Sequence, residues 1–134
     1  MVTLRQAHGM ELADVKSCFI TGGAAGIGAG VARALAERGC AVTLVDVDDA
    51  AGAATAQSLV ASGCQQVQYV HCDVTEPNQL RSALDKHWTR FGSCDAAFLN
   101  AGIEEKTSFL DEEEGQAAWR RVLVRGTPHV RWLT

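Results

Sequence analysis

A glycine-rich run near the start of the chain has the residue types of a phosphate-binding turn. Residues 21–28 read Thr-Gly-Gly-Ala-Ala-Gly-Ile-Gly and follow a short apolar segment. Missing side chains let the backbone approach a ligand closely, and the N–H groups at the start of the following helix favour a pyrophosphate. A Walker A loop would need Lys and Ser or Thr after the last glycine, but Ala29 and Gly30 stand there. The alternative is a tight connection from strand to helix without any ligand.

An acidic residue follows the second apolar segment at a spacing that suits ribose recognition. Asp46 comes 18 residues after Gly28, close to the spacing at which an acid reaches the adenosine ribose hydroxyls of a dinucleotide. The alternative is that Asp46 caps the next helix, although Asp48 and Asp49 are better placed for capping. A 2′-phosphate would be repelled by Asp46 and finds no Arg or Lys at the neighbouring Val47 or in the glycine-rich run. The sequence therefore predicts NAD rather than NADP.

Two more polar residues follow the third and fourth apolar segments. Asp73 stands in the run His-Cys-Asp-Val, where its carboxylate is placed to accept a hydrogen bond from an adenine amino group. Asn100 opens the run Asn-Ala-Gly. Taken alone, Asp73 is equally suited to cap the helix after Pro77, and Asn100 to bond backbone within a turn. All four positions follow strands, so we expect them to meet at the ligand-binding edge of one parallel sheet.

The elements that position these residues alternate along the chain. Strands are predicted at residues 17–21, 41–45, 66–71 and 96–99. The helices between them are expected to start near Ile27, at Asp48 or Asp49, and at Thr75 or Pro77. Two helical faces are predicted to be apolar: Ile27, Val31, Ala34 and Leu35 in the first helix, and Leu80, Ala83, Leu84, Trp88 and Phe91 in the third. A further helix is predicted after the acidic run 111–114. This alternation predicts an α/β fold, a Rossmann-like doubly wound parallel sheet in the order 3-2-1-4.

Taken together, these motifs resemble the short-chain dehydrogenase/reductase family. The family's TGxxxGIG turn, strand-end Asp, Asp-Val pair and NNAG element occur here in order, with Leu99 in place of the first Asn. Within the family, the chain is most similar to 15-hydroxyprostaglandin dehydrogenase-type NAD enzymes. The resemblance implies NAD as cofactor, with pyrophosphate, ribose and adenine contacts. The cofactor-binding residues expected are Gly22, Gly26, Ile27, Gly28, Asp46, Val47, Cys72, Asp73, Val74, Asn100, Ala101 and Gly102.

The catalytic residues of this family have no match in the chain. Family members use a Tyr as acid and base, with a Lys, a Ser and an Asn. The single Tyr, Tyr69, falls inside the third predicted strand and has Asp73 rather than Lys four residues later. No Asn follows Asn100, although residues 119–123 partly resemble the family's W-x-x-V-x-x-V-N-L segment. We therefore expect no catalytic residue here and a domain truncated after about four strands.

Two functions are expected from this pattern. One is the NAD-binding portion of an oxidoreductase that transfers hydride between NAD and a small alcohol or carbonyl substrate. The other is a catalytically inactive nucleotide-binding or interaction module that pairs its open fourth strand with a second copy or a full-length relative. A methyltransferase is disfavoured by the TGxxxGIG spacing and the Asn-Ala-Gly run. The organisation predicted is an N-terminal extension (1–16), a partial Rossmann domain (17–126) and a C-terminal tail (127–134).

Composition excludes several other classes of protein. The 134 residues carry 12 Lys and Arg against 16 Asp and Glu, a net charge of −4, so a nucleic-acid partner is not expected. No apolar run is long enough for a membrane span, and residues 1–15 do not resemble a secretory signal. The five cysteines form no CxxC pair, which predicts buried thiols, no metal site and a cytoplasmic location.

Overall fold

The computed structural model describes residues 11–102 of the chain. The strands are β1 (Ser17–Thr21), β2 (Ala41–Asp46), β3 (Val67–His71) and β4 (Ala96–Leu99). The helices are a 3-10 turn, η1 (Leu12–Asp14), followed by α1 (Gly26–Ala36), α2 (Asp49–Ala61) and α3 (Pro77–Phe91). Each predicted strand is confirmed to within one residue. The helix predicted after residues 111–114 and the tail at 127–134 lie outside the described residues.

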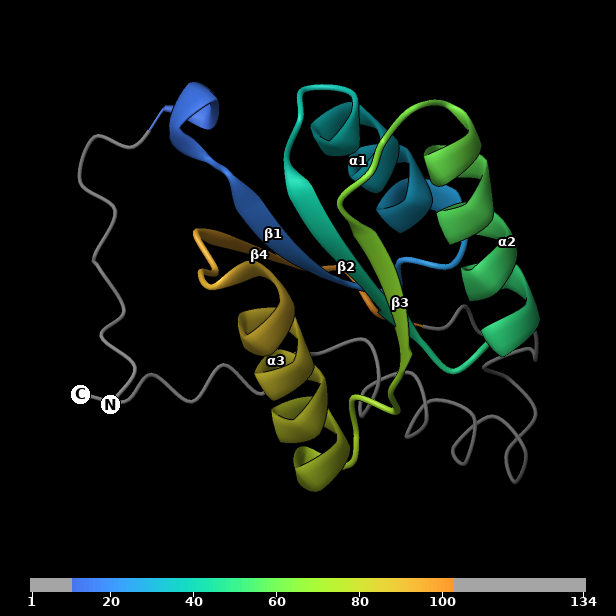
Figure 1. Ribbon diagram of the computed structural model, residues 1–134. Helices are drawn as coiled ribbons and strands as arrows, with labels where there is room; N and C mark the ends of the chain where they lie inside the picture. Colours follow the sequence, from blue (N-terminus) through green and yellow to red (C-terminus); the bar gives the residue numbers. More distant parts are fainter. Residues whose placement is uncertain (1–10, 103–134) are drawn as a thin grey trace, which may run out of the picture.

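The four strands form one parallel sheet in the order β3-β2-β1-β4, as the sequence predicts. Thr21 at the end of β1 pairs with Val45 on one side and with Leu99 on the other. The neighbouring strands therefore end at nearly the same level. The segments that leave β1, β2, β3 and β4 consequently emerge at one edge of the sheet, where ligands bind in this type of fold (Figure 1).

Helices cover both faces of the sheet and give the molecule three layers (Figure 1). Strand residues alternate between the two faces, which separates the buried side chains into two clusters. The cluster under α1 and α2 includes Ile20, Leu44 and Leu59, all fully buried. The cluster under α3 includes Phe19 and Val45. This arrangement is the doubly wound α/β fold.

The buried face of α1 differs from the prediction. Ile27 is 73% exposed and Ala34 is also exposed, whereas Leu35 is buried as expected. The side that faces the sheet is made mostly of small residues, Gly28, Ala32, Leu35 and Ala36. Small side chains give little apolar signal in a sequence, yet they let a helix approach a sheet closely. The prediction is therefore right for Leu35 and for Val31, which packs against the core, and wrong for Ile27 and Ala34.

The apolar face predicted for α3 is likewise only partly correct. Ala83 is fully buried, but Leu84 is 39% and Trp88 45% exposed. His87 takes the buried position instead, and its Nδ1 lies 2.6 Å from Thr43 Oγ1 in β2. Ala83 and His87 are four residues apart and so share one face of the helix, while Leu84 and Trp88 lie about 100° further round. A histidine gives no apolar signal even where it is buried against a strand hydroxyl, so the helical periodicity did not predict its burial.

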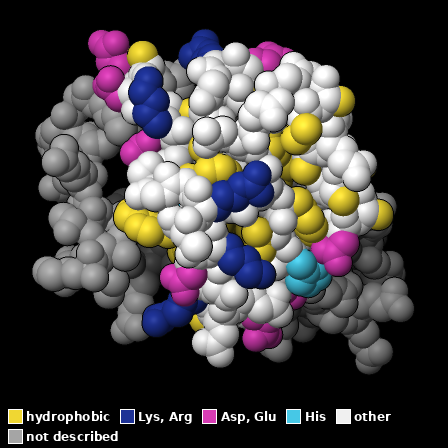
Figure 2. Space-filling model, in the orientation of Figure 1, with side chains coloured by type: hydrophobic (Ala, Val, Ile, Leu, Met, Phe, Trp, Pro, Cys, Tyr) yellow, Lys and Arg dark blue, Asp and Glu magenta, His cyan; other side chains and the backbone are white. Residues whose placement is uncertain are grey.

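The surface over α3 is charged. Basic side chains gather there with acidic ones beside them (Figure 2), and Arg81, Asp85, Lys86 and Arg90 are all exposed residues of this helix. This pattern is typical of a helix with one solvated face. Within residues 11–102, no helix is long and apolar enough to cross a membrane.

Candidate nucleotide-binding site

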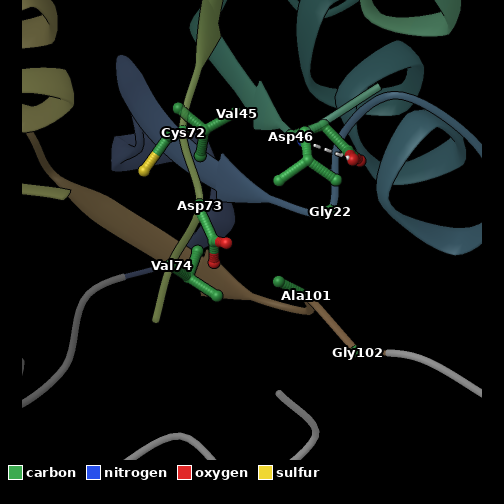
Figure 3. A pocket seen from close by; sticks show the side chains of 9 residues that line it. Gly22, Val45, Asp46, Cys72, Asp73, Val74, Ala101 and Gly102 are labelled. Atoms are coloured by element: carbon green, nitrogen blue, oxygen red, sulfur yellow. Dashed lines mark hydrogen bonds between the residues drawn. The ribbon is translucent and has the colours of Figure 1, made fainter. Parts of the chain in front are cut away.

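A pocket opens where the four strands end (Figure 3). Eight of the twelve predicted cofactor-binding residues line it, together with Val45, which the sequence motifs do not single out. The lining residues are Gly22, Val45, Asp46, Val47, Cys72, Asp73, Val74, Ala101 and Gly102. Val45 was not predicted because it lies one residue before Asp46 and has the apolar side chain of an ordinary strand residue. The fold thus brings residues from all four strand ends to one opening.

The four remaining predicted residues, Gly26, Ile27, Gly28 and Asn100, do not line the pocket itself. Gly26 and Ile27 form the exposed first turn of α1, whose N-cap, Ala25, supplies no side-chain hydrogen bond. The N–H groups of this turn therefore have no side-chain cap, and the positive end of the helix dipole lies beside them.

Two glycines of the turn are required by its geometry. Gly22 has a φ of +65°, in the left-handed region that favours glycine. A Cβ at Gly28 would collide with the carbonyl oxygen of Gly22 and approach Asn100 Nδ2 to 2.9 Å. The start of α1 can touch the backbone that follows β1 because no side chain separates them.

The Asp46 carboxylate is fixed at the end of β2 by three backbone amides. Its Oδ2 accepts a hydrogen bond from Ala24 N–H at 3.2 Å, and its Oδ1 accepts from Val47 at 2.8 Å and Asp48 at 3.3 Å. The N-cap of α2 is Asp48 instead. Its Oδ1 accepts a hydrogen bond from Ala51 N–H at 3.0 Å. The alternative role of Asp46 as the helix cap is therefore wrong. Its carboxylate bridges the glycine-rich turn and the end of β2.

Asp73 stabilises the loop after β3. Its Oδ1 accepts hydrogen bonds from Thr75 N–H at 3.0 Å and Thr75 Oγ1 at 2.7 Å. The N-cap of α3 is Glu76, with Pro77 in the first helical turn, so Asp73 is not the cap that the alternative required. The same loop carries Val74, and both residues line the pocket.

Asn100 joins the end of β4 to the glycine-rich turn. Its Nδ2 donates to the Gly22 carbonyl at 3.3 Å, and its N–H donates to Thr21 Oγ1 at 3.0 Å. Ala101 N–H donates to the same hydroxyl at 3.1 Å. The backbone-bonding role expected for Asn100 is confirmed, because it ties β4 to the glycine-rich turn after β1. Its role in cofactor binding stays a prediction. Thr21 is the shared acceptor, a structural role that the motif alone did not assign.

The cysteines are free and carry no sign of reactivity. Cys72, although it borders the pocket, is 1% exposed and packs under α3. Burial, aided by the Asp73 charge, raises its thiol pKa, and burial raises the pKa of Cys18 to about 12. These thiols stay protonated at neutral pH. Among residues 11–102, no three metal-binding side chains come together.

Tyr69 lies on the α2 side of β3, beneath the end of β2. Its hydroxyl is 2.8 Å from the Asp46 carbonyl oxygen and 2.8 Å from Asp49 Oδ1. Burial, followed by the Asp49 carboxylate, raises the pKa of Tyr69 far above its usual range. The hydroxyl therefore remains a proton donor at neutral pH, the reverse of what an acid/base tyrosine needs. Tyr69 lies inside β3, as the sequence predicts.

The sequence and the fold of this chain are similar to those of proteins of known family. A sequence profile described as short chain dehydrogenase covers residues 16–126. The chain belongs to the short-chain dehydrogenase family. Solved structures agree with this assignment. A short-chain dehydrogenase/reductase from Burkholderia phymatum, solved in complex with NAD, aligns with a TM-score of 0.68 and 31% identity over 85% of this chain and 44% of its own.

The curated relatives of this chain include a synthase and a dehydrogenase. Momilactone A synthase of Oryza sativa subsp. japonica is 41% identical over 110 residues, which span 81% of this chain and 39% of the relative. The (-)-isopiperitenol/(-)-carveol dehydrogenase of Mentha piperita, described as mitochondrial, is 38% identical over 116 residues, or 84% of this chain and 43% of the relative. The chain thus spans about two fifths of the length of these relatives. The narrower 15-hydroxyprostaglandin dehydrogenase-type assignment stays a prediction.

Proposed function

We propose that this chain binds NAD through the adenosine end and forms the cofactor-binding portion of an NAD-dependent oxidoreductase. The observation that carries the proposal is the Asp46 carboxylate, held by Ala24 N–H at the edge of a pocket lined by residues at or just after the ends of the four strands. In this fold an acid at that position accepts hydrogen bonds from ribose hydroxyls. The whole protein would transfer hydride between NAD and a small alcohol or carbonyl compound.

The residues present fit the chemical groups of NAD. Gly22 and Gly28 let the glycine-rich turn pack directly against Ala101 and the start of α1, where a Cβ would collide. The N–H groups of the first turn of α1 suit a pyrophosphate. Val47, which is 50% exposed, and Val74 offer apolar contact to an adenine ring. Asp73 and Cys72 border the same space, as do Ala101 and Gly102. Bound NAD would supply a hydride acceptor, while these residues hold and orient it.

The same site favours NAD over NADP. A 2′-phosphate on the adenosine ribose would meet the negative charge of Asp46. Among the nine residues that line the described pocket there is no Lys or Arg to neutralise the negative charge of that phosphate. We therefore infer that the phosphorylated cofactor binds more weakly.

A calorimetric titration of the chain with NAD and with NADP tests this proposal. We expect saturable NAD binding that Asp46→Ala weakens by about 10- to 100-fold, the range for losing hydrogen bonds to a charged group. Asp85→Ala removes the same charge from the exposed face of α3 and should leave NAD binding unchanged. Tighter binding of NADP, or equal NAD affinity in the Asp46→Ala variant, would contradict the proposal.

We further propose a reducing compartment such as the cytoplasm for the protein. All five cysteines are free, and Cys18, Cys40 and Cys72 are buried among apolar side chains. A free buried thiol behaves as a small hydrophobe and persists best where disulfides are kept reduced. Fluorescence microscopy of the tagged protein in its own cells tests the location, and accumulation in an oxidising compartment would refute it.

A further inference from the structure

Three side chains form a hydrogen-bonded cluster beside the pocket, between β3 and the start of α2. Asp49 Oδ1 accepts from the Tyr69 hydroxyl at 2.8 Å and from His71 Nδ1 at 2.7 Å. The Tyr69 hydroxyl also lies 2.8 Å from the backbone carbonyl of Asp46. The cluster therefore contacts Asp46, the residue that the proposed function places at the ribose. The contact is made to the main chain of Asp46 and not to its carboxylate.

The packing around Tyr69 leaves little freedom for that main chain. A Cβ at Gly52 in α2 would collide with the Tyr69 ring, so the helix backbone rests directly on the aromatic face. Three residues further along α2, Thr55 Oγ1 donates to the Ala24 carbonyl at 2.7 Å. Ala24 in turn donates its N–H to Asp46 Oδ2. The first turns of α2 thus connect the cluster on β3 to the glycine-rich turn, with Asp46 between them.

The charge states of the cluster suit a fixed arrangement at neutral pH. Hydrogen bonds from Tyr69 and then His71 hold the pKa of Asp49 below its ordinary value, so this exposed carboxylate remains a charged acceptor. His71 Nδ1 donates the second hydrogen bond to this carboxylate. The Asp49 carboxylate thus accepts from both partners.

We propose that Tyr69 and Asp49 are positioning residues that set the preference for the unphosphorylated ribose by fixing the Asp46 carboxylate. This inference rests on the proposed function. Hydrogen bonds to two ribose hydroxyls depend on tenths of an ångström, whereas repulsion of a 2′-phosphate falls slowly with distance. Loosening the cluster should therefore weaken NAD binding and change NADP binding little, which lowers the ratio of the two affinities.

Dissociation constants for NAD and NADP, measured by calorimetry on the full chain and its variants, test this inference. For Tyr69→Phe and Asp49→Ala we expect NAD binding about five- to tenfold weaker, with NADP changed less than about twofold. Asp49→Asn keeps an acceptor oxygen for the tyrosine and should retain most of the preference. Thr43→Val is the matched control, because it removes a buried hydroxyl of β2 that lies under α3, away from the pocket. It should lower the melting temperature without changing the affinity ratio.

The outcomes separate this inference from the proposed function. If the unmodified chain binds neither nucleotide, the proposed function is wrong and the positioning role is wrong with it. If the chain prefers NAD, and Tyr69→Phe and Asp49→Ala keep that preference, only the positioning role is overturned. Circular dichroism melts set the titration temperature below the transition of every variant, so that loss of folding is not read as loss of preference.

Discussion

Gly28 lies where the first turn of α1 meets the Gly22 carbonyl and the Asn100 amide. Three segments of the chain converge there, from β1, α1 and β4, and each contributes backbone or a short polar group. The proposed cofactor site depends on this contact, because it brings the start of α1 against the strand ends. At the residue scale, the absence of a side chain is what builds the site.

Two glycines of α1 provide a matched pair that tests this dependence. Gly28→Ala forces a Cβ into the Gly22 carbonyl, and we expect a loss of about 1–3 kcal/mol of folding free energy. A Cβ at Gly30 would instead extend into open space, so Gly30→Ala should gain about 0.5–1 kcal/mol from helix propensity. Urea denaturation of both variants measures the difference. Equal stabilities would contradict the close contact at Gly28.

At the scale of elements, α3 is held to the sheet by a polar contact inside an apolar interface. Gln68 Nε2 donates to Thr43 Oγ1, so the Thr43 hydroxyl is left to donate to His87 Nδ1. His87 also packs edge-on against Phe19 and Phe91. Burial lowers the pKa of His87, although the Ser93 backbone and the Asp95 carboxylate oppose part of this effect. The ring is therefore neutral in the folded protein at neutral pH.

The neutral state of His87 predicts acid sensitivity in the docking of α3. Its folded pKa lies below the unfolded value of about 6.5, so unfolding takes up a proton as the pH falls below that value. The contribution of His87 to the free energy of unfolding is fully present above about pH 6.5. It decreases as the pH falls toward the folded pKa, by no more than about 1.4 kcal/mol per pH unit. We expect His87→Gln to reduce the slope of melting temperature against pH between pH 7 and 5. An unchanged slope would mean that another group controls the acid response.

The helices and strands also show how much of the fold and of the candidate site could be predicted from the sequence. Strand bounds, the glycine turn and the acid after β2 were predictable because each depends on local residue order, and the sheet order followed from the strand–helix alternation typical of this fold. The faces of α1 and α3 were not, since burial of Ala32 and His87 depends on contacts with strands that a helical period does not encode. The Tyr69–Asp49 contact joins residues 20 apart and carries no motif. Such contacts become visible only once the sheet register is known.

At the scale of the whole molecule, the described sheet has two outer strands. Among residues 11–102, β4 pairs only with β1, and Leu99 at its end is 55% exposed. The aligned part makes up less than half of each of these relatives, which therefore contain further chain beyond it. An unpaired parallel edge with apolar side chains favours association with another strand.

We propose that this edge makes the chain self-associate as its concentration rises. A lysine at position 99 would oppose strand pairing, because a charged edge side chain disfavours a second strand. Sedimentation velocity should therefore show less association for Leu99→Lys than for the unmodified chain. Leu84→Lys, a similarly exposed leucine on α3, should leave association unchanged. A chain that stays monomeric at every concentration would refute the proposal.

The most direct test of the central claim is a crystal structure of this chain with NAD. We predict the adenosine ribose hydroxyls within hydrogen-bond distance of the Asp46 carboxylate, and the pyrophosphate against the N–H groups that open α1. Electron density for NAD outside the pocket at the strand ends, or a ribose turned away from Asp46, would contradict the account.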